Sequence, residues 1–346
     1  MKLSMTLNYS GDPVQAAATA ADYEKAGVDM IWVAELYSFD AVSILGYLAA
    51  KTETMELASG LFPIYSRTPA LTASTAAGLD AVSQGRFVLG LGASGPQVIE
   101  GWHGVKYDKP LTRTRELIDI CRIVWRRERL EYQGDAYTLP LPADQGSGLG
   151  KPLKLINRPV RENIPIWVAS LGHKNVSMTA ELADGWLPVF FHPDKARDVW
   201  GDDLDDGFAK RSSDLGPLQI AAGGTVAITD DKSVADGIRD FARPMTALYV
   251  GGMGAKGKNF YNNIFKRYGY EEEAEKIQDL YLDGKKDEAA ALVPDDFLDA
   301  TAMVGDEGWV KERIQAYKAA GVTHLQITPV GDKPLEIIEK VKAWAE

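Results

Sequence analysis

The segment best suited to chemistry is a glycine-rich run, GLGASG, at residues 90–95. It follows an apolar stretch and fits the G-x-G-x-x-G pattern, whose glycines let backbone amides approach the phosphates of a dinucleotide. Its context differs from that of a dinucleotide turn, because Pro96 comes directly after the third glycine and the acidic candidates Glu116 and Asp119 fall within a helical pattern. We therefore interpret the run as an anion-binding turn or, alternatively, as a tight turn without a ligand.

Histidine and cysteine residues give no sign of a metal centre. The chain has four histidines, at no metal-ligand spacing and in no cluster with carboxylates: His103, His173, His192 and His324. We therefore expect no metal ion. The only cysteine, Cys121, lies in a helical pattern and is expected to be a buried structural thiol. Glu35 is the acid best placed to act, because it follows a predicted strand; its alternative role is a charge at the start of a helix.

Composition limits the partners of the protein. The 346 residues include 38 basic and 49 acidic side chains, for a net charge of −11, which would repel a nucleic-acid backbone or an anionic membrane. We expect neither as a partner. No apolar run of membrane-spanning length and no basic-then-apolar leader is present, so we expect a cytoplasmic protein.

Short apolar runs alternate with amphipathic segments, which is typical of parallel βα units. The predicted strands cover residues 2–8, 30–34, 55–62, 86–90, 164–170, 185–189, 218–228 and 323–328. The predicted helices cover residues 14–26, 41–50, 69–83, 112–127 and 175–183, with a hairpin at 130–139 and a closing helix at the C-terminus. Eight strands with helical crossovers predict an α/β fold, a (β/α)8 TIM barrel. Residues 230–305 are mostly helical in pattern, so we expect a helical insertion between strands seven and eight of a single domain covering residues 1–346.

Several segments, in order along nearly the whole chain, carry a resemblance to a known family. They are residues 35–52, 66–74, 79–104, 164–188 and 260–270, and they include SQGRFVLGLG at 83–92 and ADGW at 183–186. The chain resembles the bacterial luciferase-like superfamily, and within it the branch that uses coenzyme F420, a deazaflavin, such as the methylenetetrahydromethanopterin reductases. This resemblance implies a homodimeric oxidoreductase that transfers a hydride between F420 and a small organic substrate.

The resemblance also implies which residues hold the cofactor. The phosphate would lie on the turn after strand four, formed by Gly92, Ala93, Ser94 and Gly95, with Gln97 and Val98 beside it. A second segment that contacts the phosphate end of the cofactor would follow strand five, at Ala169, Ser170, Leu171 and Gly172. Lys174 would add a positive charge there or, alternatively, be a solvated lysine at a helix start.

At the ring end of the cofactor, the resemblance implies a bulge in strand three with a cis peptide bond between Gly60 and Leu61. It places Glu35 near the ring as the catalytic acid. Relatives often have Asp-His at this point, whereas here Leu36 follows Glu35, so the imidazole is missing. Arg67 after strand three would pair either with an anionic tail or with a surface acid.

Two other functions remain open from the sequence. One is an FMN-dependent monooxygenase of the same superfamily. The other is a cofactor-binding protein with little catalysis, which the missing histidine would allow. Because deazaflavins react poorly with oxygen, binding of F420 would imply a reductase or dehydrogenase.

Overall fold

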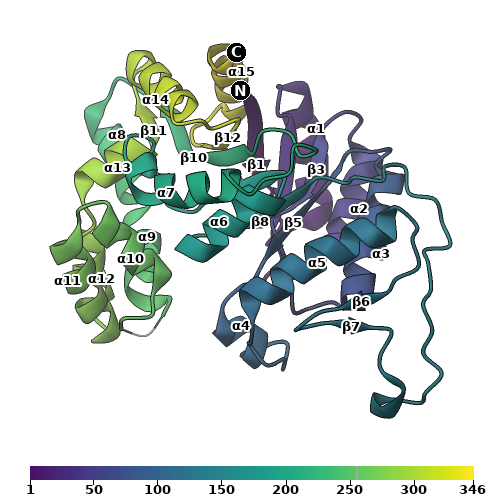
Figure 1. Cartoon of the computed structure of the whole chain (residues 1–346). Helices are drawn as coiled ribbons and strands as arrows, with labels where there is room; N and C mark the ends of the chain where they lie inside the picture. The colour runs from purple at the N-terminus through teal and green to yellow at the C-terminus, as the bar shows by residue number, and fades with distance from the viewer. Residues whose placement is uncertain (255) are drawn as a thin grey trace.

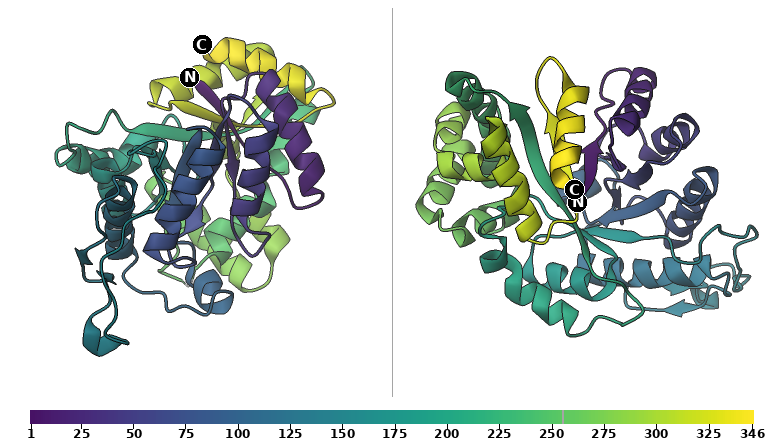
Figure 2. Two further views of the ribbon diagram at one scale, coloured as in Figure 1. Left: turned by 90° about the vertical axis from the view of Figure 1, so that its right-hand side faces the viewer. Right: turned by 90° about the horizontal axis from the view of Figure 1, so that it is seen from above.

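The computed structural model describes residues 1–254 and 256–346, and eight parallel strands form a closed barrel at its centre (Figures 1 and 2). In order around the barrel these are β1 (Lys2–Thr6), β2 (Met30–Val33), β3 (Glu56–Ser59), β5 (Phe87–Gly92), β8 (Ile166–Ala169), β9 (Gly185–Leu187), β10 (Gln219–Ile228) and β12 (His324–Pro329). Pairing of β1 with β12 and of β9 with β10 closes the ring. The predicted (β/α)8 barrel is confirmed.

Alternation along the strands divides the core into two parts. In β1, for example, Leu3 and Met5 pack in the large cluster between strands and helices, so that Ser4 and Thr6 face the inside of the barrel. The lower interior is filled by a second, smaller cluster with members from five strands: Met30, Trp32, Ala58, Val88, Trp167 and Ala221. The barrel is therefore packed at its centre and can hold a ligand only at its ends.

Helices cover the outside of the barrel, as Figure 2 shows from above. They are α1 (Pro13–Lys25), α2 (Ala41–Lys51), α3 (Pro69–Val82), α5 (Pro110–Trp125), α6 (His173–Leu182), α7 (Ala196–Phe208), α14 (Glu307–Ala319) and α15 (Pro334–Ala345). Side chains of Asp12, Asp40 and Thr68 cap the first three helices, which fixes where each one begins. In the described part of the chain, no helix is both long and apolar enough to cross a membrane.

The elements differ from the sequence prediction at a few points. The strand expected at residues 55–62 is divided into β3 and a short β4 (Phe62–Pro63), which pairs with β5 instead. Between them the peptide bond joining Gly60 and Leu61 is cis, as the resemblance predicts. The hairpin is confirmed as β6 (Tyr132–Gln133) and β7 (Thr138–Leu139). Helices α4 (Pro96–Gly101) and α7 had not been predicted.

The segment between β10 and β12, here called the β10–β12 segment, builds a lobe beside the barrel (Figure 1). It contains α8 (Lys232–Asp240), α9 (Arg243–Ala247), a π-helix (Leu248–Gly252), α10 (Phe260–Arg267), α11 (Glu271–Leu282), α12 (Lys286–Ala291), α13 (Asp295–Thr301) and β11 (Met303–Gly305). The sequence predicted a mostly helical insertion and no strand at residues 303–305. Instead β11 pairs in parallel with the end of β10, from Val226–Met303 to Ile228–Gly305, and extends the barrel sheet into the lobe.

Candidate functional site

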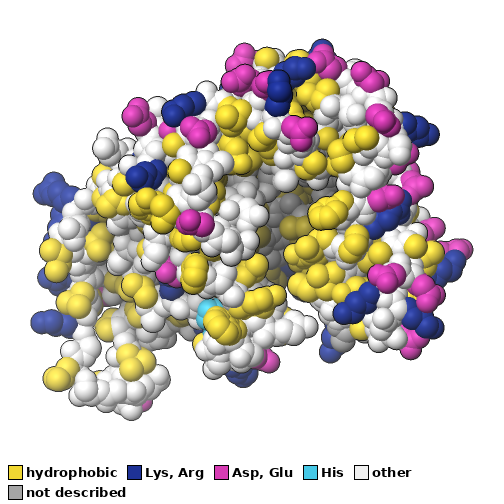
Figure 3. Space-filling model, turned by 180° about the vertical axis from the view of Figure 1, so that it is seen from behind, with side chains coloured by type: hydrophobic (Ala, Val, Ile, Leu, Met, Phe, Trp, Pro, Cys, Tyr) yellow, Lys and Arg dark blue, Asp and Glu magenta, His cyan; other side chains and the backbone are white. Residues whose placement is uncertain are grey.

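The carboxyl ends of the strands surround the mouth of the barrel, which is where (β/α)8 enzymes place their active sites. Seen from behind, the molecule has a hollow between the lobe and the barrel, with hydrophobic side chains along its rim (Figure 3). Within the mouth the chain packs closely at Gly60 and Leu61, against Trp32 and Gly92. A Cβ atom at Gly60 would lie 2.9 Å from the Cβ atom of Trp32, and one at Gly92 would overlap the side chain of Leu61. At Gly60 the contact is with the first side-chain atom of Trp32, whereas at Gly92 the end of the Leu61 side chain would have to move to admit a larger residue.

The turn after β5 offers free backbone donors. Ser94 has φ of 57°, in the left-handed region, and Gly95 begins α4 without a side-chain cap. Within residues 1–254 and 256–346, the backbone amides of Ala93, Ser94 and Gly95 have no hydrogen-bond acceptor. Consecutive free amides around a left-handed residue form a concave donor surface that suits an anion. Gln97 is exposed and Val98 half-buried on the first turn of α4 beside it.

The chain after β8 offers a second set of donors. Gly172 begins α6, and no described side chain caps that helix, so the positive end of the helix dipole is open. Ser170 contributes only its backbone, because its buried hydroxyl group lies 2.9 Å from the Thr179 hydroxyl group. Leu171 and Ala169 are half-buried, and the Leu171 carbonyl group accepts a hydrogen bond from Trp200.

Lys174 is exposed on the first turn of α6 and forms no ion pair with a described residue. It lines a groove of about 670 Å³ between α5, α6 and the β6–β7 hairpin, at the outer edge of the mouth. The opposite wall of that groove is occupied by internal contacts. Arg115 is paired with Glu181 at 2.7 Å, and Glu116 accepts hydrogen bonds from the hairpin backbone.

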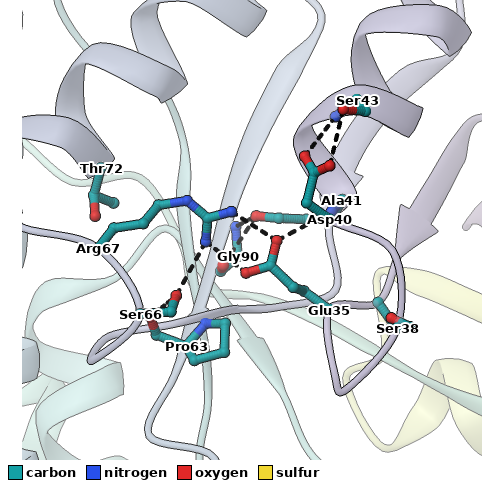
Figure 4. A network of polar contacts seen from close by, with 12 residues as sticks. Glu35, Ser38, Asp40, Ala41, Ser43, Pro63, Ser66, Arg67, Thr72 and Gly90 are labelled. Atoms are coloured by element: carbon teal, nitrogen blue, oxygen red, sulfur yellow. Dashed lines mark hydrogen bonds and ion pairs between the residues drawn. The ribbon is translucent and has the colours of Figure 1, made fainter. Parts of the chain in front are cut away.

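Glu35, after β2, lies in a buried ion pair rather than free in the mouth (Figure 4). Its two carboxylate oxygens accept hydrogen bonds from Arg67 at 2.5 and 2.7 Å, and one also accepts from the Ala41 amide at 3.0 Å. Glu35 is 8% exposed, and the Arg67 guanidinium group also lies 4.3 Å from the ring centre of Phe62. The pair therefore ties the loop after β2 to the chain after β4, and Arg67 is engaged inside the protein instead of at the surface.

Four neutral polar side chains that the sequence analysis did not identify face the mouth from β1, β10 and β12, on the side away from the turn after β5. They are Thr6, Thr225, Gln326 and Thr328. The register places Thr225 beside Thr328 and Gly223 beside Gln326, and Gln326 donates a hydrogen bond to Thr6 at 2.9 Å. Thr6 and Thr328 are exposed although they lie in barrel strands. The signal was present, since polar residues alternate with Leu325 and Ile327 along β12.

Aromatic side chains of the β10–β12 segment stand beside the mouth. Tyr249 and Tyr261 lie 4.8 Å apart between ring centres, and each packs edge-to-face on Phe190, just after β9. Burial raises the pKa of Tyr261 to about 12, while burial and then the nearby charge of Tyr37 raise the pKa of Tyr249. Tyr37 lies on the loop after β2, the strand that stands across the barrel ring from β9.

A metal site is not indicated in the described part of the chain, where no three His, Cys, Asp or Glu residues are grouped to hold an ion. His103 lies just beyond α4, half-buried, and its Nε2 atom has no described partner. His192 and His324 are buried, and His173 lies 2.9 Å from Asp203.

Comparison with known proteins agrees with this geometry. Residues 1–324 match the family model of the luciferase-like monooxygenases. A protein of Mycobacterium tuberculosis whose name describes a coenzyme F420-dependent oxidoreductase is 42% identical over 337 residues, 95% of each chain. The 5,10-methylenetetrahydromethanopterin reductase of Archaeoglobus fulgidus is 30% identical over 92% of this chain and 91% of its own.

Among solved structures, the coenzyme F420-dependent tetrahydromethanopterin reductase of Methanopyrus kandleri is similar in fold. It superposes with a TM-score of 0.78 at 23% identity, covering 99% of this chain and 97% of its own. Together, the barrel, the glycine-rich turn after β5 and the match over residues 1–324 show that the chain belongs to the luciferase-like monooxygenase family.

Proposed function

We propose that the protein is an F420-dependent oxidoreductase that transfers a hydride between the deazaflavin and an organic substrate. The observation that carries this proposal is the row of unpaired amides at Ala93, Ser94 and Gly95, which follow Gly92 where it packs closely on the bend of the chain between β3 and β4 at Leu61. The amides suit a phosphate group, and the bend suits the face of a planar ring. The name of the Mycobacterium tuberculosis relative supports F420 as the molecule that carries both.

The residues present fit this cofactor at both ends. The phosphate would be held by Gly92, Ala93, Ser94 and Gly95, with Gln97 and Val98 beside it. Residues 169–172 and the uncapped start of α6 would face it from the other side, and Lys174 would add positive charge for an anionic tail. When bound, the deazaflavin supplies a ring carbon that gives or takes the hydride.

The side chains of the protein would orient the reactants and exclude water. Gly60 and Leu61 would back the ring, while the Glu35–Arg67 pair keeps the neighbouring loops in place. The carboxylate of Glu35 already accepts three hydrogen bonds from the chain, so the geometry supports a positioning role for it better than proton transfer.

Fluorescence of the tryptophans tests the proposal, because Trp32 and Trp167 lie directly below the mouth. We expect saturable quenching when the purified protein is titrated with F420, and much weaker quenching with FMN. Stronger binding of FMN, followed by oxygen-dependent turnover of reduced FMN, would support the monooxygenase reading instead. Tight F420 binding without turnover on a broad substrate panel would support a cofactor-binding protein.

A further inference from the structure

We propose that the mouth accepts an uncharged substrate with an aromatic or alicyclic body and one hydrogen-bonding group, such as a ketone or an enone. This inference rests on the proposed function, since it concerns the part of the mouth that the cofactor would leave open. It is drawn from two surfaces of this chain. One is formed by the neutral polar side chains of β1, β10 and β12, and the other by the aromatic side chains Tyr249 and Tyr261 of the β10–β12 segment.

The order of the strands around the barrel divides the mouth into a half with free amides and a half with neutral polar side chains. Around the closed ring, β12 lies directly across from β5, and β1 lies across from β8. The free amides therefore occupy one half, after β5 and β8. The other half is bounded by Thr6, Thr225, Gln326 and Thr328, which face inward from β1, β10 and β12.

These four side chains are polar but carry no charge. Gln326 uses one amide hydrogen on Thr6, and the described hydrogen bonds leave its second hydrogen and its carbonyl group available. Arg67 is paired with Glu35, and Lys333, on the loop after β12, is paired with Glu336, so neither cation is free to act as a counter-charge. A neutral carbonyl or hydroxyl group could exchange its water for hydrogen bonds here, whereas a carboxylate would lose hydration without a free counter-charge.

The body of the substrate would be recognised by aromatic rings. Tyr249 and Tyr261 are held edge-to-face by Phe190, so they are rigid contact surfaces. On the other side, the loop after β2 exposes three large apolar side chains: Leu36 (54%), Tyr37 (70%) and Phe39 (63%). Contiguous exposed apolar groups at a hollow indicate a binding surface, and here they would close over a flat apolar molecule.

The test compares two probes that differ by one charge, acetophenone and 4-acetylbenzoate. Both are titrated by ligand-observed NMR into protein saturated with oxidised F420, after F420 binding has been measured separately. We expect acetophenone to bind at least tenfold more tightly. Equal or tighter binding of 4-acetylbenzoate, or no binding of either probe, would overturn the inference.

Variants locate the binding surface. Gln326→Leu should weaken acetophenone binding about three- to tenfold, the value of one lost hydrogen bond, and Tyr37→Ala should weaken it by a similar factor. Gln219→Leu, at the opposite end of β10, and Tyr47→Ala, on α2, are the matched controls and should bind as the parent does. If both test variants melt at the parent temperature and bind acetophenone unchanged, the pocket is elsewhere.

The design separates this inference from the proposed function. A protein that does not bind F420 but prefers acetophenone when both probes are titrated without the cofactor would contradict the proposed function and keep the selectivity of the mouth. A protein that binds F420 but prefers the carboxylate probe would contradict only the inference.

Discussion

Arg67 donates hydrogen bonds from both of its terminal nitrogens to the two carboxylate oxygens of Glu35, at 2.5 and 2.7 Å, in a site where the two side chains are 12% and 8% exposed. Both charges are thus removed from water and depend on each other. Removal of one partner leaves the other buried without compensation, which costs about 3–5 kcal/mol of unfolding free energy.

We therefore expect Glu35→Gln and Arg67→Met each to destabilise the protein by about 3 kcal/mol, and the double variant to lose much less than the sum. A double-mutant cycle from urea unfolding measures the coupling. Purely additive losses would show that the two charges do not depend on each other.

Turnover of the same variants separates the two roles of Glu35. If it positions loops, the double variant should regain much of the turnover that Glu35→Gln loses at saturating F420. If it transfers a proton, turnover should stay low in both variants, and the catalytic role implied by the resemblance would be the better account.

Ser94→Glu should weaken F420 binding by at least about tenfold, because it places a negative charge where the turn after β5 would hold a phosphate. Ser213→Glu is the matched control, since Ser213 is exposed before β10 at the opposite end of the barrel. Fluorescence quenching gives both affinities. An unchanged affinity in Ser94→Glu would remove this turn from the cofactor site.

Two glycines should respond in opposite directions to the same substitution. In Gly90→Ala the added methyl group would overlap the Ser59 carbonyl oxygen, so we expect a loss of about 1–3 kcal/mol. Gly46→Ala, inside α2 with no atom within 4 Å of the new methyl group, should stabilise by about 0.5–1 kcal/mol. Thermal melting checks both, and a stable Gly90→Ala protein would mean that β3 and β5 can separate.

Acid should destabilise the protein through His324, at the lower end of the barrel. Burial lowers the pKa of this residue from 6.5 to about 4, and its Nε2 atom has no described partner. The unfolded chain therefore takes up a proton at a higher pH than the folded one. The stability that neutral His324 provides is complete above about pH 6.5 and is lost as the pH falls toward about 4, by up to about 3 kcal/mol.

The check is the unfolding free energy of the parent and of His324→Phe at about pH 7 and about pH 4.5. The phenyl ring keeps the edge contact with Trp167, whose ring centre lies 5.0 Å away. We expect the variant to lose less stability on acidification. His192, whose pKa is also lowered by burial, acts in the same direction in both proteins. Equal losses would show that His324 does not carry the effect.

The sequence was sufficient for the barrel because apolar runs such as residues 30–33 and 166–169 mark strands, and because helix starts are marked by residues such as Asp40. It failed where local pattern does not decide structure. Residues 55–62 are mostly apolar, and no turn signal marks the end of β3 at Ser59. The chain there is set by close packing of Gly60 on Trp32, which lies far away in sequence.

For the site, the glycine-rich turn could be found from the sequence because its small residues leave the backbone amides accessible to an anion. The partnership of Glu35 with Arg67 could not, because 31 residues separate them and either could equally have faced solvent. The aromatic contact between Phe190 and Tyr249 likewise depends on how the β10–β12 segment folds back over the barrel.

The pairing of β11 with β10 also has a practical consequence for protein engineering. Because the lobe is joined to the barrel by a strand ladder from Val226 to Ile228, it can be exchanged between relatives as a cassette only if those three register positions are kept. A cassette that keeps them would replace Tyr249 and Tyr261 while leaving the turn at residues 92–95 untouched. New substrate ranges could then be built without rebuilding the cofactor site.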